Sequence, residues 1–154
     1  MIVCQVPYDI SYMKLALSEA QKAFDRESVP VGAVVVYNEK IIAAAGNEVE
    51  KNGLVTFHAE MLAITQASQK LQEKYLTECT MYVTLEPCAM CAQAISFARI
   101  KNLYFGAYDF KYGAIIHGCH VFQYSPHKPN VIGGILETEC ANIIRNFFNK
   151  KRQN

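Results

Sequence analysis

The segment TLEPCAMC, which ends at Cys91, constrains the fold more than any other part of the chain. The apolar run Met81 to Leu85 predicts a strand, and Ala89 to Ala98 predicts a helix. Pro87 disfavours helical geometry in the residue before it and so marks the helix start. Cys88 and Cys91 then lie one helical turn apart, near the positive helix end that lowers the pKa of a thiol. Both sulfurs can therefore face one ion.

The remaining pattern predicts a sheet covered by helices. Asn102 to Ala107 predicts a second strand soon after the Ala89 to Ala98 helix, and strand, helix and strand in so few residues indicate a parallel pair with a right-handed crossover. Further helices are expected over Ser11 to Arg26, His58 to Leu71 and Thr138 to Arg152, the first of them capped by Asp9 or Ser11. A hairpin is expected from two apolar strands, Ala33 to Tyr37 and Ile41 to Asn47. Both hairpin strands are expected to be buried on two faces. Tyr108 to Asn130, with its glycines and prolines, is expected to be an irregular loop. The alternation predicts a three-layer α/β fold in one domain, residues 1–154.

The whole-chain properties narrow the class of protein. A length of 154 residues suits a single core, and 51% hydrophobic with 19% charged residues argues against disorder. The N-terminus has no secretory pattern and no apolar run is long enough to span a membrane, so a cytoplasmic location is expected. The net charge of +1 excludes a strongly basic surface, so any nucleic-acid contact must be local.

The six cysteines are not expected to form a disulfide framework in a reducing compartment. They are Cys4, Cys79, Cys88, Cys91, Cys119 and Cys140. A close CxxC pair there is more typical of a metal site or a redox pair. A closed structural zinc site would need two more ligands, which Cys119 with His117 or His120 could supply. A thioredoxin-like redox pair is the other alternative, weakened by the absence of an early strand, CxxC and helix pattern.

A better third ligand lies upstream in TFHAEML. His58 and Glu60 stand two positions apart, and such residues on a helix point to nearly opposite sides, so they can share a site only at its opening turn. We therefore expect His58 at or just before the first turn. With Cys88 and Cys91 it makes three ligands, which leave the fourth position of a zinc ion open to water. Glu60, not needed as a ligand, can then move protons.

With these motifs, HAE and PCAMC, the sequence resembles the zinc-dependent cytidine deaminase superfamily and, more closely, the bacterial tRNA adenosine deaminases. HxE together with PCxxC is the signature of zinc deaminases as a class. The resemblance extends from about Ser11 to Arg152 and includes VPVGAVVV, AGNE, TLEPCAMCAQAI, ARI, FGAYDFKYGA and GGILETEC.

The resemblance implies a three-layer α/β/α sandwich around a central mixed five-stranded sheet, and a zinc-dependent hydrolytic deaminase. His58, Cys88 and Cys91 would bind one Zn²⁺ per subunit, Glu60 would shuttle protons, and Asn47, Val29, Pro87 and Asp109 would bind the substrate. The implied substrate is adenosine at the wobble position of a tRNA anticodon loop, converted to inosine, and the implied assembly is a homodimer. A deaminase of free guanine, cytosine or deoxycytidylate would share the zinc site and is the main alternative. A zinc-structured RNA-binding module without activity is another.

Three departures from the family pattern lie near the motifs. Phe57 precedes the HAE motif where an alanine is usual, Phe97 with Ala98 replaces His-Ser, and Tyr108 replaces a common arginine. Features that could contact RNA are the basic run Lys150 to Arg152 and the aromatic residues Tyr108, Phe110 and Tyr112. The basic run also suits a helix C-terminus, and alternating aromatic residues also suit strand packing.

Overall fold

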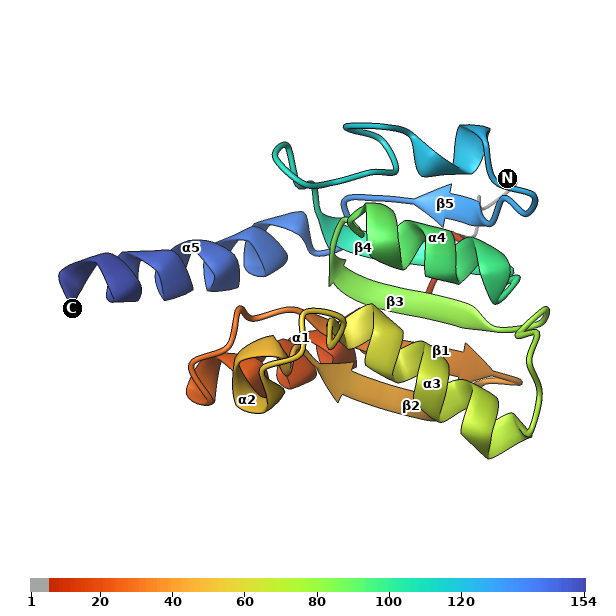
Figure 1. Cartoon of the computed structure of the whole chain (residues 1–154), viewed down its shortest axis with the longest axis horizontal. Coiled ribbons are helices and arrows are strands. Elements are labelled where there is room, and N and C mark those ends of the chain that lie inside the picture. Colours follow the sequence, from red (N-terminus) through yellow and green to blue (C-terminus); the bar gives the residue numbers. More distant parts are fainter. Residues whose placement is uncertain (1–5) are drawn as a thin grey trace, which may run out of the picture.

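The computed structural model describes residues 6–154, which form one five-stranded mixed sheet with helices on both faces (Figure 1). The strands are β1 (Gly32–Tyr37), β2 (Lys40–Gly46), β3 (Thr80–Leu85), β4 (Asn102–Ala107) and β5 (Asn130–Ile132). The helices are α1 (Ile10–Asp25), α2 (Val49–Asn52), α3 (Ala59–Leu71), α4 (Ala89–Phe97) and α5 (Glu137–Gln153), with a short 3-10 helix, η1 (Val121–Gln123), before β5. The strand order is β2-β1-β3-β4-β5. The expected α/β/α fold with a mixed five-stranded sheet is confirmed.

Two apolar clusters lie on opposite faces of the sheet. One includes residues of α3 and α4, such as Ala63 and Ile95, packed on Val83 and Phe105 of the sheet. The other includes α1 and α5 residues around Tyr82 and Tyr104. Figure 1 shows α3 and α4 together in front of the sheet, with α1 behind it. The two metal-motif helices therefore share one face.

The first hairpin forms as expected, but one of its strands is less buried than expected. Asn38 and Glu39 both have positive φ, 48° and 60°, which is the backbone of a two-residue turn that matches strand twist. β1 is buried almost throughout because it pairs with β2 on one side and β3 on the other. The expectation that both strands are buried on two faces is wrong for β2, where Ile41 is 37% exposed, because β2 is an edge strand.

The strand, helix and strand prediction around the CxxC pair is confirmed. β3 pairs in parallel with β4, and α4 connects them. The segment Tyr108 to Asn130, expected to be irregular throughout, contains η1 and ends in the first residue of β5, which pairs in parallel with β4. A strand of three residues after Pro129 carries too little pattern for sequence reading.

The cysteines within residues 6–154 are free thiols, as expected for this pattern, and Cys4 lies outside the described residues. Among the described helices, each is too short or too polar to cross a bilayer.

Candidate active site

His58 and Glu60 share a site because the first lies before the helix and the second in its opening turn. His58 is the N-cap residue of α3, with an extended backbone of φ −67° and ψ 151°. Glu60 is in the first turn and is only 4% exposed. The prediction that His58 lies at or just before the first turn is confirmed.

The two thiols lie at the start of α4 in the same manner. Cys88 is the N-cap residue, extended at φ −72° and ψ 173°, and Cys91 follows in the first turn, fully buried. The Pro87 carbonyl oxygen accepts a hydrogen bond from the Ala114 N–H at 3.0 Å, which fixes the chain before the helix. Two helix N-termini thus meet at one point.

His58, Cys88 and Cys91 form a cluster whose ligand atoms all lie within 4.8 Å of one another. The Nδ1 atom of His58 is 3.6 Å from Cys88 Sγ and 3.5 Å from Cys91 Sγ. A tetrahedral zinc ion with Zn–S of about 2.3 Å and Zn–N of about 2.0–2.1 Å separates its nitrogen and sulfur ligands by about 3.6 Å. The donor set and its spacing therefore fit a zinc ion with three protein ligands.

The alternative of a closed four-ligand site is not supported within residues 6–154. The cluster there contains neither His117, His120 nor Cys119. His117 Nδ1 lies 2.8 Å from a carboxylate oxygen of Glu86, and His120 Nδ1 lies 3.2 Å from the Ile115 carbonyl oxygen. Cys119 is exposed.

The thiols and the imidazole shift one another's pKa values. The hydrogen bond from Cys91, with that from His58, outweighs burial and lowers the pKa of Cys88 to about 4. The same contact and burial raise the pKa of Cys91. The pKa of His58 is raised, chiefly by its hydrogen bond with Cys88. The contact between the two thiols thus separates their pKa values, and zinc coordination requires both to be deprotonated.

Glu60 lies in surroundings that favour its protonated form. Burial raises its pKa, and the nearby Cys88 adds to the effect. A carboxyl group whose pKa is shifted toward neutrality is suited to both accepting and donating a proton.

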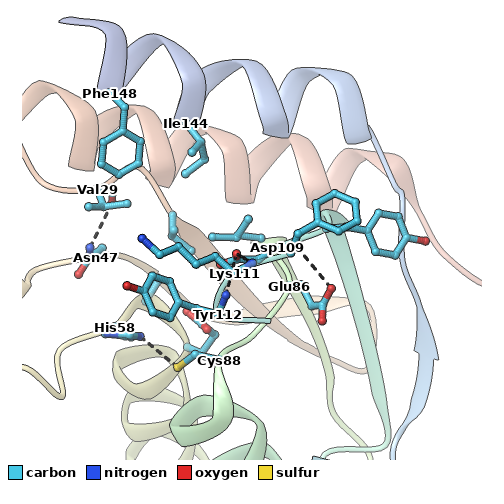
Figure 2. Close-up of a pocket in the computed structure, with 16 residues that line it drawn as sticks. Val29, Asn47, His58, Glu86, Cys88, Asp109, Lys111, Tyr112, Ile144 and Phe148 are labelled. Atoms are coloured by element: carbon cyan, nitrogen blue, oxygen red, sulfur yellow. Dashed lines mark hydrogen bonds between the residues drawn. The ribbon is translucent and has the colours of Figure 1, made fainter. Parts of the chain in front are cut away.

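The cluster opens into a cavity of about 820 Å³ (Figure 2). The lining comes from segments far apart in the chain: Val29, Val31, Asn47, His58, Ala59, Glu60, Leu85, Glu86, Cys88, Tyr108 to Tyr112, Ile144 and Phe148. Cavities of this size are within the range of small-molecule sites, about 300–1,000 Å³. Its walls are mostly apolar.

Three of the four expected substrate-binding residues lie on this lining. Asn47 is nearly buried, and its side-chain amide donates to the Val29 carbonyl oxygen at 3.2 Å and accepts from the Val49 N–H at 3.1 Å. An amide oriented this way retains one N–H and one lone pair for a ligand. Asp109 lies on the loop after β4, whereas Pro87 is buried outside the lining.

Sequence reading missed part of the cavity wall. Ile144 and Phe148 line it from α5, which begins at Glu137, far from His58 in the chain, and their helical spacing indicated only a buried face. Tyr108, Phe110 and Tyr112 lie after the end of β4, so the strand-packing interpretation does not apply to them. Phe110 and Tyr112 are exposed, which favours the alternative of a stacking loop.

The departures from the family pattern fall in different places. Tyr108 packs edge-on against Phe105, with ring centroids 5.2 Å apart, and lines the cavity. Phe97 is 63% exposed at the end of α4, and the Phe57 carbonyl oxygen accepts from the Glu48 N–H. Of the three positions, Tyr108 alone is on the cavity lining.

Comparison with known proteins agrees with this geometry. The family model for the MafB19-like deaminase matches residues 9–152. The chain is 47% identical over 143 residues to a tRNA-specific adenosine deaminase of Agrobacterium fabrum, covering 92% of this chain and 94% of that one. It is 42% identical to the tRNA-specific adenosine deaminase of Bacillus subtilis, covering 94% and 91%. A solved structure from studies of A-to-I editing by tRNA:A34 deaminases at the wobble position of transfer RNA superposes with a TM-score of 0.86 at 45% identity, covering 88% of this chain and 99% of that one.

Proposed function

The chain belongs to the MafB19-like deaminase family and to the tRNA-specific adenosine deaminases, and we propose that it converts adenosine to inosine at the wobble position of a tRNA anticodon loop. The observation that carries the proposal is the His58, Cys88 and Cys91 cluster, of which His58 and Cys88 line a cavity together with the buried Glu60. The overall reaction adds water to the base and releases ammonia. Residues 1–154 would act as one deaminase domain, because both ends of the described chain, in α1 and α5, pack on the same face of the sheet.

His58, Cys88 and Cys91 would hold one zinc ion per subunit, because their spacing fits three of its four tetrahedral positions. Zinc, when bound, supplies a Lewis acid that allows water to ionise near neutral pH. Two thiolates and a neutral imidazole balance the charge of the dication.

Glu60 would move the protons. As a carboxylate it accepts one proton from the attacking water and passes it to the ring nitrogen next to the reacting carbon. It accepts the second proton of that water and delivers it to the departing amino group, which leaves as ammonia. Its burial keeps these transfers away from bulk solvent.

The other walls would select and orient the base. Asn47 lies on the cavity lining, retains an N–H and a lone pair beyond its two hydrogen bonds, and would hydrogen-bond the base. Val29 lies on the lining, where it would exclude water and offer an apolar face, and Asp109 lies on the same lining. Pro87 would contribute through its place before Cys88, since it is buried behind the lining.

An unpaired base suits this site better than a paired one, since a base inside a duplex is out of reach of such a cavity. We also propose a cytoplasmic homodimer, as the resemblance implies, with part of the RNA contact on the second subunit.

The test is incubation of the protein with an anticodon stem-loop carrying a wobble adenosine and, separately, with guanine, cytosine and deoxycytidylate. Inosine in the stem-loop is expected, with none in a control stem-loop whose only adenosines are base-paired. Ammonia from a free base or nucleotide, without inosine in the RNA, would instead assign the protein to the small-molecule deaminases.

A further inference from the structure

Glu86 is a buried carboxylate that neither the metal cluster nor the proton transfers use. It lies between β3 and Cys88, and its side chain is 0% exposed. A charge buried to this extent is retained only where hydrogen bonds compensate for the loss of water. The groups that provide them identify what the carboxylate holds.

All the compensating donors come from the loop that follows β4. One oxygen, Oε2, accepts from the backbone N–H groups of Ile115, Ile116 and His117 at 3.2, 3.2 and 3.1 Å. The other, Oε1, accepts from the Asp109 N–H at 3.4 Å and lies 2.8 Å from His117 Nδ1. Glu86 thus binds both ends of the loop 109–117, and Figure 2 shows its bond to Asp109.

Further contacts attach the same loop to the metal-ligand segment. Gly113 forms a bridge with Cys88, and a Cβ atom at Gly113 would lie 2.4 Å from Glu86 Oε2 and 2.3 Å from the Asp109 carbonyl oxygen. The loop therefore packs on the carboxylate without space between them. Asp109 in turn continues the chain of contacts, because its Oδ1 accepts from the N–H groups of Lys111 and Tyr112, both at 3.0 Å.

Lys111 and Tyr112, here called the loop tip, are two of the exposed residues of this loop. Tyr112 is 65% exposed, and its ring extends toward the His58 and Cys88 side of the cavity in Figure 2. The ammonium group of Lys111 lies 5.1 Å from the centre of that ring. An aromatic face beside a cation offers stacking to a base and a counter-charge to a phosphate.

We propose that Glu86 is a positioning residue, which holds the loop 109–117 so that Tyr112 and Lys111 bind a nucleotide next to the reacting adenosine. This inference rests on the proposed function for the identity of the bound nucleic acid. Glu86 acts through the loop, since its own oxygens are occupied by loop donors.

The test uses Glu86→Gln and Glu86→Asp in the full chain, with Glu73→Gln, an exposed site after α3, as the matched control. The amide of Gln places an NH₂ group against loop donors, so KM for the stem-loop is expected to rise about ten-fold or more. kcat is expected to change less than about three-fold with metal content unchanged, since the metal ligands and Glu60 stay in place. Glu86→Asp, which keeps the charge, is expected to recover part of the affinity, and Glu73→Gln to match the wild type.

A double-mutant cycle separates positioning from general stability. If Glu86 acts through the loop tip, Glu86→Gln should raise KM far less in a Tyr112→Ala background than in the wild type. Effects that multiply fully, or a loss of kcat and metal with KM unchanged, would overturn the proposal.

A readout without RNA keeps this test apart from that of the proposed function. The amides of Ile115, Ile116 and His117 should exchange hydrogen faster in Glu86→Gln than in the wild type, with metal content unchanged. If the wild type makes no inosine but this exchange accelerates, the proposed function fails and the anchoring role stands. Unchanged exchange would refute the anchoring role whatever the activity.

Discussion

Glu60 and His58 stand two positions apart in the chain, yet the proposed mechanism gives them different tasks, which single substitutions can separate. Glu60→Gln keeps the shape of the side chain and removes its ability to carry a proton. We expect metal content to be unchanged and inosine formation to fall by about 10²–10⁴-fold. Elemental analysis and a stem-loop assay measure the two quantities, with Glu73→Gln as control. Activity near the wild-type level would show that another group moves the protons.

Cysteine substitutions distinguish an open metal site from a closed one. Cys91→Ser is expected to lose both bound metal and activity, because a serine hydroxyl replaces a fully buried thiolate ligand. Cys119→Ser should keep both, since Cys119 is exposed and lies outside the cluster. Metal loss on substitution of Cys119 would restore the four-ligand alternative.

The candidate site residues that could be predicted from the sequence are those whose position is set by the residues next to them in the chain. Cys88 and Cys91 follow a proline, and His58 precedes a helix, so spacing alone places each at a helix N-terminus. Glu86 is different, because its donors lie about thirty residues further along in a loop of irregular backbone. Local pattern carries no information about such a contact.

Among the elements, α1 packs so closely on β1 that there is no space for a side chain at Gly32. A Cβ atom at Gly32 would lie 1.9 Å from the Ala16 carbonyl oxygen of α1, and Ala16 is fully buried. Gly32→Ala is expected to destabilise the fold by about 1–3 kcal/mol through overpacking. Urea unfolding measures the free energy of unfolding.

Gly53→Ala is the matched comparison for that substitution. Gly53 has open space around it but a positive φ of 64°, so alanine there should cost about 1–2 kcal/mol from backbone strain without any steric clash. A Gly32→Ala protein as stable as the wild type would mean that α1 can move away from the sheet freely.

Sequence patterns are sufficient to predict the long helices and strands, but not the short ones. The long helices and β4 were predicted to within about one residue, because their periodicity runs over several turns or over a full apolar run. α2 and β5 were missed. α2 has four residues, and β5 has three, held by pairing with β4 and by the bond from Asn130 Nδ2 to Asn102 Oδ1 at 2.9 Å.

For the whole molecule, the proposed metal ligands come from two helices that pack on the same face of the sheet. His58 belongs to the start of α3, and the two thiols belong to the start of α4. A ligand that binds only the folded state stabilises it, by about 4 kcal/mol when its free concentration is a thousand times Kd. Removing the metal with a chelator is therefore expected to lower Tm by several degrees, and added zinc to restore it, as calorimetry can measure. The His58→Ala protein should have the low Tm from the start and respond to neither treatment. An unchanged Tm on chelation of the wild-type protein would contradict the proposed ligand set.

The position of β3 has a consequence for the order of events during folding. His58 and Cys88 are 30 residues apart, and the chain between them includes β3, which pairs with β1 on one side and β4 on the other. Closing a loop of this length costs conformational entropy, and the sheet contacts offset that cost only once they have formed. A nascent chain cannot assemble the ligand set before Cys91 has been synthesised and the centre of the sheet has begun to form. Binding of the proposed metal by all three ligands is therefore expected to depend on the assembly of the middle strand, β3.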